Sequence, residues 1–262
     1  MDSLWRVFQD SVLRLWVACT YLFLYIPLIV LAVFSFNEIA FPYRWVGFSL
    51  RWYRELAISA EIWEATKNSL IVAGSAVFLS VTLGLFFVMW CSQQRRGNYL
   101  LSFFYPNLVV PEIVIAVGLL SLFVFLNVPL GIPSLIVGHT LLGFGYAVPI
   151  IYTRFNVLDK RLIEASLDLG ATHRQTFVKI VLPLLMPAIV SASLLVFILS
   201  LDDFLMAFFC GGTSAQTLSL YIFSMIRSGV SPVVNALATV MLVVSSLLVM
   251  VFCSIKTKET IW

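Results

Sequence analysis

Residues 159–183 read DKRLIEASLDLGATHRQTFVKIVLP and form a polar interruption between two long apolar segments. Asp159 is a typical helix N-cap, and Gly170 stands where a left-handed residue would end the helix that follows. Thr172 and Gln175 then have the spacing of a capping box, which predicts a second helix that Pro183 would end. The stretch therefore predicts two short helices outside the membrane.

The first of these helices has an apolar face. Leu162, Ile163, Leu167 and Leu169 are too few to span a membrane, yet they lie on an otherwise charged segment. Such a face is typical of a helix that docks on a partner. A solvated loop between two membrane helices fits the composition equally well, so both interpretations remain open at this point.

The composition identifies the class of protein. The 262 residues are 61% hydrophobic and 11% charged, with a mean hydropathy of +1.02, whereas soluble domains carry about a quarter charged residues. The chain is therefore expected to be an integral membrane protein. The net charge of +3 is small and lies in the loops, so it does not indicate a nucleic-acid-binding protein. The cysteines have no metal-ligand spacing and are interpreted as small buried residues.

Six apolar segments have the length of about 20 residues that a membrane span needs. They cover residues 15–36, 68–90, 100–126, 134–153, 185–209 and 233–255. We therefore predict an all-α membrane protein with six transmembrane helices in a single domain, residues 1–262. Residues 1–14 and the aromatic-rich residues 37–66 predict short interfacial helices. A signal peptide is disfavoured because the first apolar run is too long and lacks a small-residue cleavage site.

The distribution of Lys and Arg predicts the orientation. Six spans place both termini on one side, together with the loops after the second and fourth spans. That side holds 11 of the 16 basic residues, namely Arg6, Arg14, Arg95, Arg96, Arg154, Lys160, Arg161, Arg174, Lys179, Lys256 and Lys258. Because positive charge is retained in the cytoplasm, both termini and residues 159–183 are expected to be cytoplasmic.

Four ionisable residues lie within the predicted spans: Glu112, His139, Asp202 and Asp203. Such groups are costly in a bilayer, so each is a functional hypothesis. Three acids without a basic residue in the spans favour a cationic substrate. Neighbours in a helix point about 100° apart, so Asp202 and Asp203 cannot both face one pore. The alternative is that the acids hydrogen-bond across the helix bundle, and His139 is better explained as a partner of a neighbouring side chain.

The sequence contains no Gly-x4-Gly-Lys-Ser/Thr phosphate-binding loop and no nucleophile paired with a histidine. We therefore expect a non-enzymatic protein that binds no cofactor or metal. If it moves a solute uphill, the energy must come from a gradient or a partner protein.

The polar stretch resembles the EAA motif of ABC-importer permeases. Glu164-Ala165-Ser166, Gly170 and Ile180-Val-Leu-Pro183 match that motif at every spacing, with Ser166 in place of the second alanine. The resemblance implies a type I ABC importer permease fold in the bacterial inner membrane. It also implies that the first short helix, with Arg161, Glu164, Ala165, Ser166 and Gly170, is a coupling helix. This helix would dock on a separate subunit that uses ATP and Mg²⁺, and Ala165 and Ser166 would allow close backbone approach.

A narrower resemblance covers most of the chain. Trp45-x-Gly47-Phe48, Pro111-Glu-Ile-Val114 and Leu199-Ser-Leu-Asp-Asp203-Phe204 are similar to segments of spermidine/putrescine permeases, with the C-type subunit as the best match. The resemblance implies a second, B-type permease, two copies of an ATPase and a periplasmic polyamine-binding protein as partners. Three departures are Glu112 where Asp is usual, Thr217–Leu220 without a proline, and Val234 in place of an acid.

The sequence thus predicts a permease subunit of an ATP-driven polyamine importer. The expected substrate path contains Asp202, Asp203, Glu112, Ser200, Trp45 and Tyr146, where the aromatic rings would add cation–π contacts. The alternatives are an ABC permease for another solute, such as an aminophosphonate or a metal cation, a proton- or sodium-coupled secondary carrier, and a channel subunit.

Overall fold

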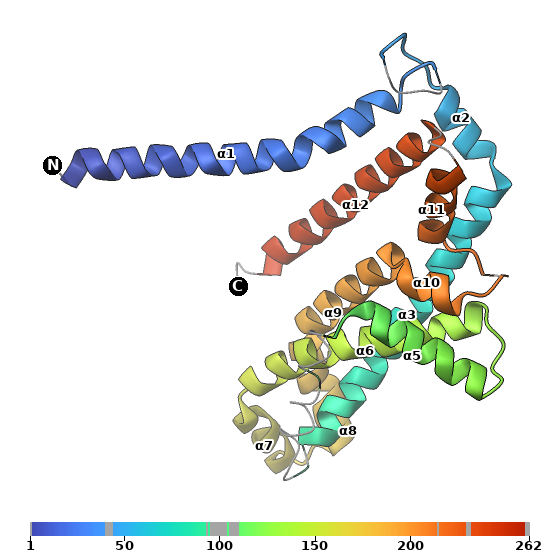
Figure 1. The fold of residues 1–262 in the computed structure, drawn as a ribbon. Helices are drawn as coiled ribbons and strands as arrows, with labels where there is room; N and C mark the ends of the chain where they lie inside the picture. The colour runs from blue at the N-terminus through green and yellow to red at the C-terminus, as the bar shows by residue number, and fades with distance from the viewer. Residues whose placement is uncertain are drawn as a thin grey trace. The chain divides into compact units, whose positions relative to one another are not determined.

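The computed structural model describes residues 2–39, 44–92, 94, 104, 110–213, 215–228 and 232–259, and the described part is almost entirely helical (Figure 1). The helices are α1 (Asp2–Phe34), α2 (Arg51–Ile58), α3 (Ala60–Ser92), α5 (Glu112–Phe125), α6 (Ile132–Val157), α7 (Lys160–Asp168), α8 (His173–Thr176), the π-helical η2 (Phe177–Val181), α9 (Leu182–Asp202), α10 (Leu205–Cys210), α11 (Leu218–Ser228) and α12 (Pro232–Glu259). Within these residues no strand forms, and one isolated bridge pairs Asn37 with Phe48. The all-α prediction is confirmed for this part of the chain.

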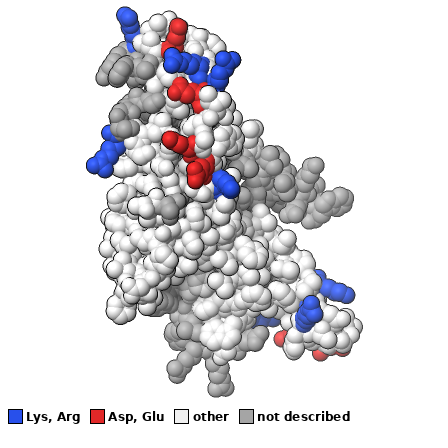
Figure 2. All heavy atoms as spheres, turned by 90° about the vertical axis from the view of Figure 1, so that its right-hand side faces the viewer, with Lys and Arg blue, Asp and Glu red and all other residues white. Residues whose placement is uncertain are grey.

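Four helical stretches among the described residues are long and apolar enough to cross a membrane: Val12–Phe34, Ala60–Ser92, Ile132–Val157 and His173–Asp202. The other two predicted spans correspond to α5 and α12, of which shorter apolar parts are described. Part of the predicted span 100–126 lies outside the described residues, so the number of six spans stays a prediction. On the face drawn in Figure 2, most of the surface is uncharged and the charged side chains gather in patches.

We expected residues 1–14 to form a separate interfacial helix, and this expectation was wrong. Helix α1 runs without interruption from Asp2 to Phe34. No glycine, proline or capping residue lies between Arg14 and the apolar run, so the backbone hydrogen bonding continues from one into the other. Pro27 is accommodated inside the helix.

Contacts divide the chain into two compact units, residues 1–60 with 222–262 and residues 61–221. The first unit contains a short non-helical connection between α1 and α2, where interfacial helices were expected. Its organising residue is Asn37, whose side chain donates to the carbonyl of Arg44 (2.9 Å) and accepts from the amide of Val46 (3.0 Å). The indole of Trp52 donates to the Asn37 carbonyl at 2.7 Å. These bonds replace helical ones, and among the described residues between α1 and α3 only α2 is helical.

The second unit is built on the packing of α6 against α9, with α3 across both. Small residues meet at the contact: Gly84 of α3 faces Ala147 of α6, and Ala192 of α9 is fully buried. Gly143 of α6 faces Ser80 of α3 and Val196 of α9 so closely that a β-carbon would lie 2.6 Å from atoms of both. Close backbone approach over small residues is the usual way in which membrane helices associate.

A second cluster joins α5, α6 and α10. Ala116 and Leu119 of α5, Leu135 of α6, and Met206 and Cys210 of α10 are buried together. This packing holds the short helix α10 against α5 and α6, and it places the residues directly before α10 inside the unit.

Pro183 does not end the second short helix, contrary to the prediction. Helices α8, η2 and α9 follow one another without a gap from His173 to Asp202. The amide of Leu182 donates to the carbonyl of Phe177, five residues earlier. This wider π-helical turn lies where a proline ring clashes with the carbonyl four residues before it, and it relieves the clash without ending the helix.

The packing around Gly143 generates a stability prediction. Gly143→Ala should lower the unfolding free energy of the purified protein in detergent by about 1–3 kcal/mol, because the new methyl group overpacks the α3–α6–α9 contact. Thermal unfolding followed by circular dichroism measures the effect.

Gly74→Ala in α3 is the matched control, since a β-carbon there has nothing within 4 Å. We expect it to be neutral or slightly stabilising, because alanine forms helix more readily than glycine. Equal losses of stability in the two variants would contradict close packing at Gly143.

Candidate functional site

The fifth apolar segment contains a helix break at its pair of acids. Helix α9 ends at Asp202, and α10 begins at Leu205, so the helix is interrupted within the predicted span 185–209. Asp203 has an extended backbone (φ −66°, ψ 123°), and its carboxylate Oδ1 accepts a hydrogen bond from the amide of Met206 at 3.2 Å. An Asp side chain that bonds its own following backbone competes with the helix, which explains the break.

The two acids at the helix break lie in different surroundings. Asp202 is exposed at the end of α9, whereas Asp203 is buried. The pair was expected to diverge by 100° around one helix, but the change of backbone conformation at Asp203 decides their directions instead.

The carboxylate of Asp203 faces a histidine. Its Oδ2 lies 3.3 Å from His139 Nε2 of α6, and both side chains are only 1% exposed. Neither of these two atoms has an aligned hydrogen-bond partner among the described residues. The other ring nitrogen, His139 Nδ1, lies 3.0 Å from the hydroxyl of Ser200 in α9. The expectation that His139 is the partner of a neighbouring side chain is therefore confirmed, but that neighbour includes one of the acids.

Glu112 joins the same cluster from α5. It is the first residue of that helix, directly after Pro111, and it is half-buried. Its carboxyl group lies beside that of Asp203. The fold thus brings together Glu112, Asp203 and Ser200 of the predicted path and adds His139, which sequence reasoning had set aside.

The remaining members of the predicted path are placed differently. Tyr146 is half-buried on α6, where it packs against the cluster of α5, α6 and α10. Trp45 belongs to the other unit, in the connection between α1 and α2, and its side chain is 47% exposed. No described contact joins either ring to the acids.

Residues 216–219, at the start of α11, form hydrogen bonds that connect the helix break at Asp203 to α3. The hydroxyl of Ser219 donates to the carbonyl of Asp203 at 2.6 Å. The amide of Leu218 donates to the hydroxyl of Ser69 in α3 at 2.8 Å, and Asn68 donates to the carbonyl of Gln216 at 3.1 Å. The start of α11 therefore connects α3 to the break. Sequence reasoning missed this role of Ser69 and Ser219, because isolated serines in apolar segments carry no pattern.

The polar stretch 159–183 forms the second candidate site, and its local structure confirms the predicted caps. Asp159 accepts from the amide of Arg161 at 3.0 Å, and Thr172 and Gln175 form the capping box. Helix α7 ends with Gly170 in the left-handed region (φ +84°). The amides of Gly170 and Ala171 bond to the carbonyls of Leu167 and Ser166, which is the Schellman arrangement.

Helix α7 presents a mixed surface. Arg161, Glu164 and Ala165 are exposed, as are Leu162 (48%) and Leu169 (89%). Ser166 is buried instead, and its hydroxyl lies 3.0 Å from that of Thr176 in α8. The side chain of Ser166 therefore joins α7 to α8.

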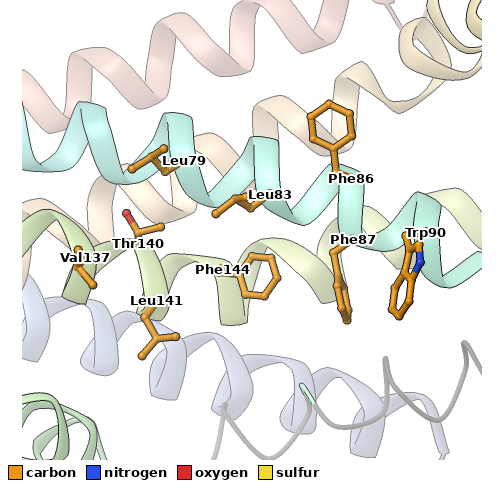
Figure 3. A pocket seen from close by; sticks show the side chains of 9 residues that line it. All are labelled: Leu79, Leu83, Phe86, Phe87, Trp90, Val137, Thr140, Leu141 and Phe144. Atoms are coloured by element: carbon orange, nitrogen blue, oxygen red, sulfur yellow. The ribbon is translucent and has the colours of Figure 1, made fainter. Parts of the chain in front are cut away.

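An apolar pocket of about 560 Å³ lies between α3 and α6. Figure 3 shows that it is lined by Leu79, Leu83, Phe86, Phe87 and Trp90 from α3 and by Val137, Thr140, Leu141 and Phe144 from α6. None of the acids lines it, and Thr140 supplies its only hydroxyl group. The pocket is therefore chemically unsuited to a cation.

The chain was compared with known proteins. Residues 76–256 match the family described as "Binding-protein-dependent transport system inner membrane component". The chain is 39% identical over 241 residues to the spermidine/putrescine transport system permease protein PotC of Haemophilus influenzae, covering 91% of this chain and 94% of the relative. It is 40% identical over 236 residues to PotC of Escherichia coli, covering 89% of each chain.

Among solved structures, the fold is similar to a chain of a bacterial ABC transporter involved in the import of the acidic polysaccharide alginate. The TM-score is 0.72 over 96% of both chains, at 13% identity, so this likeness concerns the fold alone. The family match covers most of this sequence, and the two relatives match it over nearly their whole length. The chain therefore belongs to the family of inner-membrane components of binding-protein-dependent transport systems, and it is a permease subunit of an ABC importer.

Proposed function

We propose that this permease moves polyamines such as spermidine and putrescine from the periplasm to the cytoplasm. The observation that carries the proposal is the meeting of Glu112 and Asp203 at the break between α9 and α10. Two neighbouring carboxyl groups offer an ammonium group several oxygen acceptors and negative charge. The named substrates of the two PotC relatives have this chemistry.

The substrate path in this proposal contains the buried pair Asp203 and Ser200, the half-buried Glu112 and Tyr146, and the exposed Asp202 and Trp45. Among the residues that the structure describes, no lysine or arginine forms an ion pair with Asp203. A basic partner would cancel the charge that attracts the substrate. Among the described residues, no lysine or arginine therefore competes with the substrate for Asp203.

The proposal assigns energy coupling to α7. Its exposed residues Arg161, Glu164 and Ala165 would lie in a cleft of the ATPase, with Leu162 and Leu169 as apolar contacts. Leu169 is 89% exposed directly before the left-handed turn at Gly170. A leucine so exposed in a polar loop is explained if a partner covers it. Ser166 contributes by fixing α7 on α8.

The complete transporter in this proposal has six spans in this chain, with both termini and residues 159–183 in the cytoplasm. A second permease of the B type, two copies of the ATPase and a periplasmic polyamine-binding protein complete it. This chain binds no cofactor, and ATP with Mg²⁺ is used by the ATPase. Each nucleotide state would favour either the outward-facing or the inward-facing arrangement of the spans.

Purification and reconstitution test the class of transporter. The tagged permease should copurify with an ATPase, and uptake of radiolabelled spermidine into proteoliposomes should require ATP and the binding protein. Transport by the permease alone, driven by a proton or sodium gradient, would instead identify a secondary carrier. Passive flux without any energy source would identify a channel.

Substitutions at Gly170 test the coupling helix. A left-handed backbone costs a residue with a side chain about 1–2 kcal/mol, and asparagine tolerates this conformation better than other residues. Uptake and ATPase copurification should therefore fall in the order Gly170→Asn, Gly170→Ala, Gly170→Val, while the amount of permease in the membrane stays constant.

A β-carbon at Gly170 meets nothing within 4 Å in this chain. A loss of coupling without a loss of protein must therefore come from the backbone turn or from the docked partner. Normal uptake by the valine variant would remove the coupling role from α7.

Neutral variants of the acids test the substrate path. Asp203→Asn and Glu112→Gln should each raise the KM for spermidine uptake about tenfold, because each removes a charge-assisted contact with an ammonium group. The two effects should be non-additive, since the carboxyl groups touch.

Asp202→Asn is the matched control for this pair. Its side chain is exposed at the end of α9, so its effect should add to that of either variant. Unchanged uptake in the Asp203 and Glu112 variants would remove both acids from the path.

A further inference from the structure

The carboxylate of Asp203 faces the imidazole of His139, and no lysine or arginine among the described residues pairs with it. His139 Nε2 and Asp203 Oδ2 face each other at 3.3 Å, and both side chains are 1% exposed. Neither atom has an aligned hydrogen-bond partner among the described residues. The amide of Met206 binds the other carboxylate oxygen, Oδ1, at 3.2 Å, and His139 is the side chain that faces Oδ2.

The imidazole ring is itself anchored. Ser200 lies 3.0 Å from His139 Nδ1, and it stands in the last turn of α9, three residues before Asp203. Position 138, directly before the histidine, is a glycine that packs against the thioether of Met206 in α10. Helix α6 thus contacts both sides of the break, and contacts at both nitrogens fix the plane of the ring.

An imidazole differs from a lysine or arginine in one respect that matters here. It forms hydrogen bonds through both nitrogens without carrying a charge, whereas arginine always brings a positive charge and lysine brings one unless burial neutralises it. A neutral partner can therefore orient a carboxylate and leave its negative charge for another cation. Glu112 touches the same carboxylate from α5 and is partly exposed, so a cation can reach the pair of acids from that side.

We propose that His139, anchored by Ser200, is a positioning residue that keeps the Asp203 carboxylate in the orientation that binds an ammonium group of the substrate. This inference rests on the proposed function, because it takes Asp203 as part of the substrate path. His139 acts only through Asp203 and does not touch the substrate.

The test uses the complete transporter in proteoliposomes, with uptake of radiolabelled spermidine, the amount of assembled complex and ATP hydrolysis measured together. His139→Leu should raise the KM about tenfold while the assembled complex and the maximal rate stay near normal, because an oriented contact to a charged group is lost. His139→Gln should stay within about threefold of the unchanged protein, since its amide also bonds without charge. A structural role alone would lower the amount of complex and leave the KM unchanged.

A double-mutant cycle separates positioning from general damage. In an Asp203→Asn background, His139→Leu should add nothing, because the group that it positions has lost its charge. Thr140→Val at the next position of α6 is the matched control, since the Thr140 hydroxyl has no hydrogen-bond partner among the described residues. Its effect, if any, should be the same in both backgrounds.

If the complex with His139→Leu does not assemble, Ser200→Ala tests the positioning role instead, because it removes only the hydroxyl that anchors the imidazole ring. It should raise the KM in the unchanged protein and have no effect beside Asp203→Asn. A KM unaffected by either variant, or effects that add to that of Asp203→Asn, overturns the proposal. An unchanged KM in Asp203→Asn alone would instead count against Asp203 in the proposed function.

Discussion

Hydrocarbon offers no hydrogen-bond partner to a peptide group, so a helix in a membrane can end only where protein atoms take over its bonds. The break at Asp203 depends on this constraint. The amide of Asp203 still bonds to Leu199, its carboxylate accepts from Met206, and its carbonyl accepts from Ser219. Because α10 and the start of α11 supply these bonds, a charged side chain with irregular backbone is retained inside an apolar unit.

One helix pair connects this buried cluster with the polar loop. Helices α6 and α9 pack along each other, and His139 and Ser200 join them beside the acids. Near the loop, Arg154 of α6 donates to the carbonyl of Leu184 in α9 at 3.2 Å. Densely packed helices transmit displacements with little deformation. The pair is therefore suited to move as one body.

The residues predicted well are those whose role is local. Asp159, Gly170 and Thr172 act on backbone groups within a few positions of themselves, so their spacing in the sequence already contains the geometry. We did not predict the interruption of the fifth apolar segment, residues 185–209, because an apolar run that contains only two acids has the composition of a single span. The contact of Ser166 with Thr176 was missed for a similar reason, since it joins two helices whose packing no local pattern encodes.

The sequence by itself determined the class of protein, the apolar segments and the caps of the polar stretch, because hydropathy, charge and capping depend on residue type and short spacing. It also singled out Glu112 and Asp203 by the cost of placing them in a bilayer. Only the tertiary structure decided that these acids meet, that Asp202 turns away, and that His139 faces Asp203. Those residues lie on α5, α6 and α9, and their meeting depends on how three helices pack over small side chains, a property that no single segment carries.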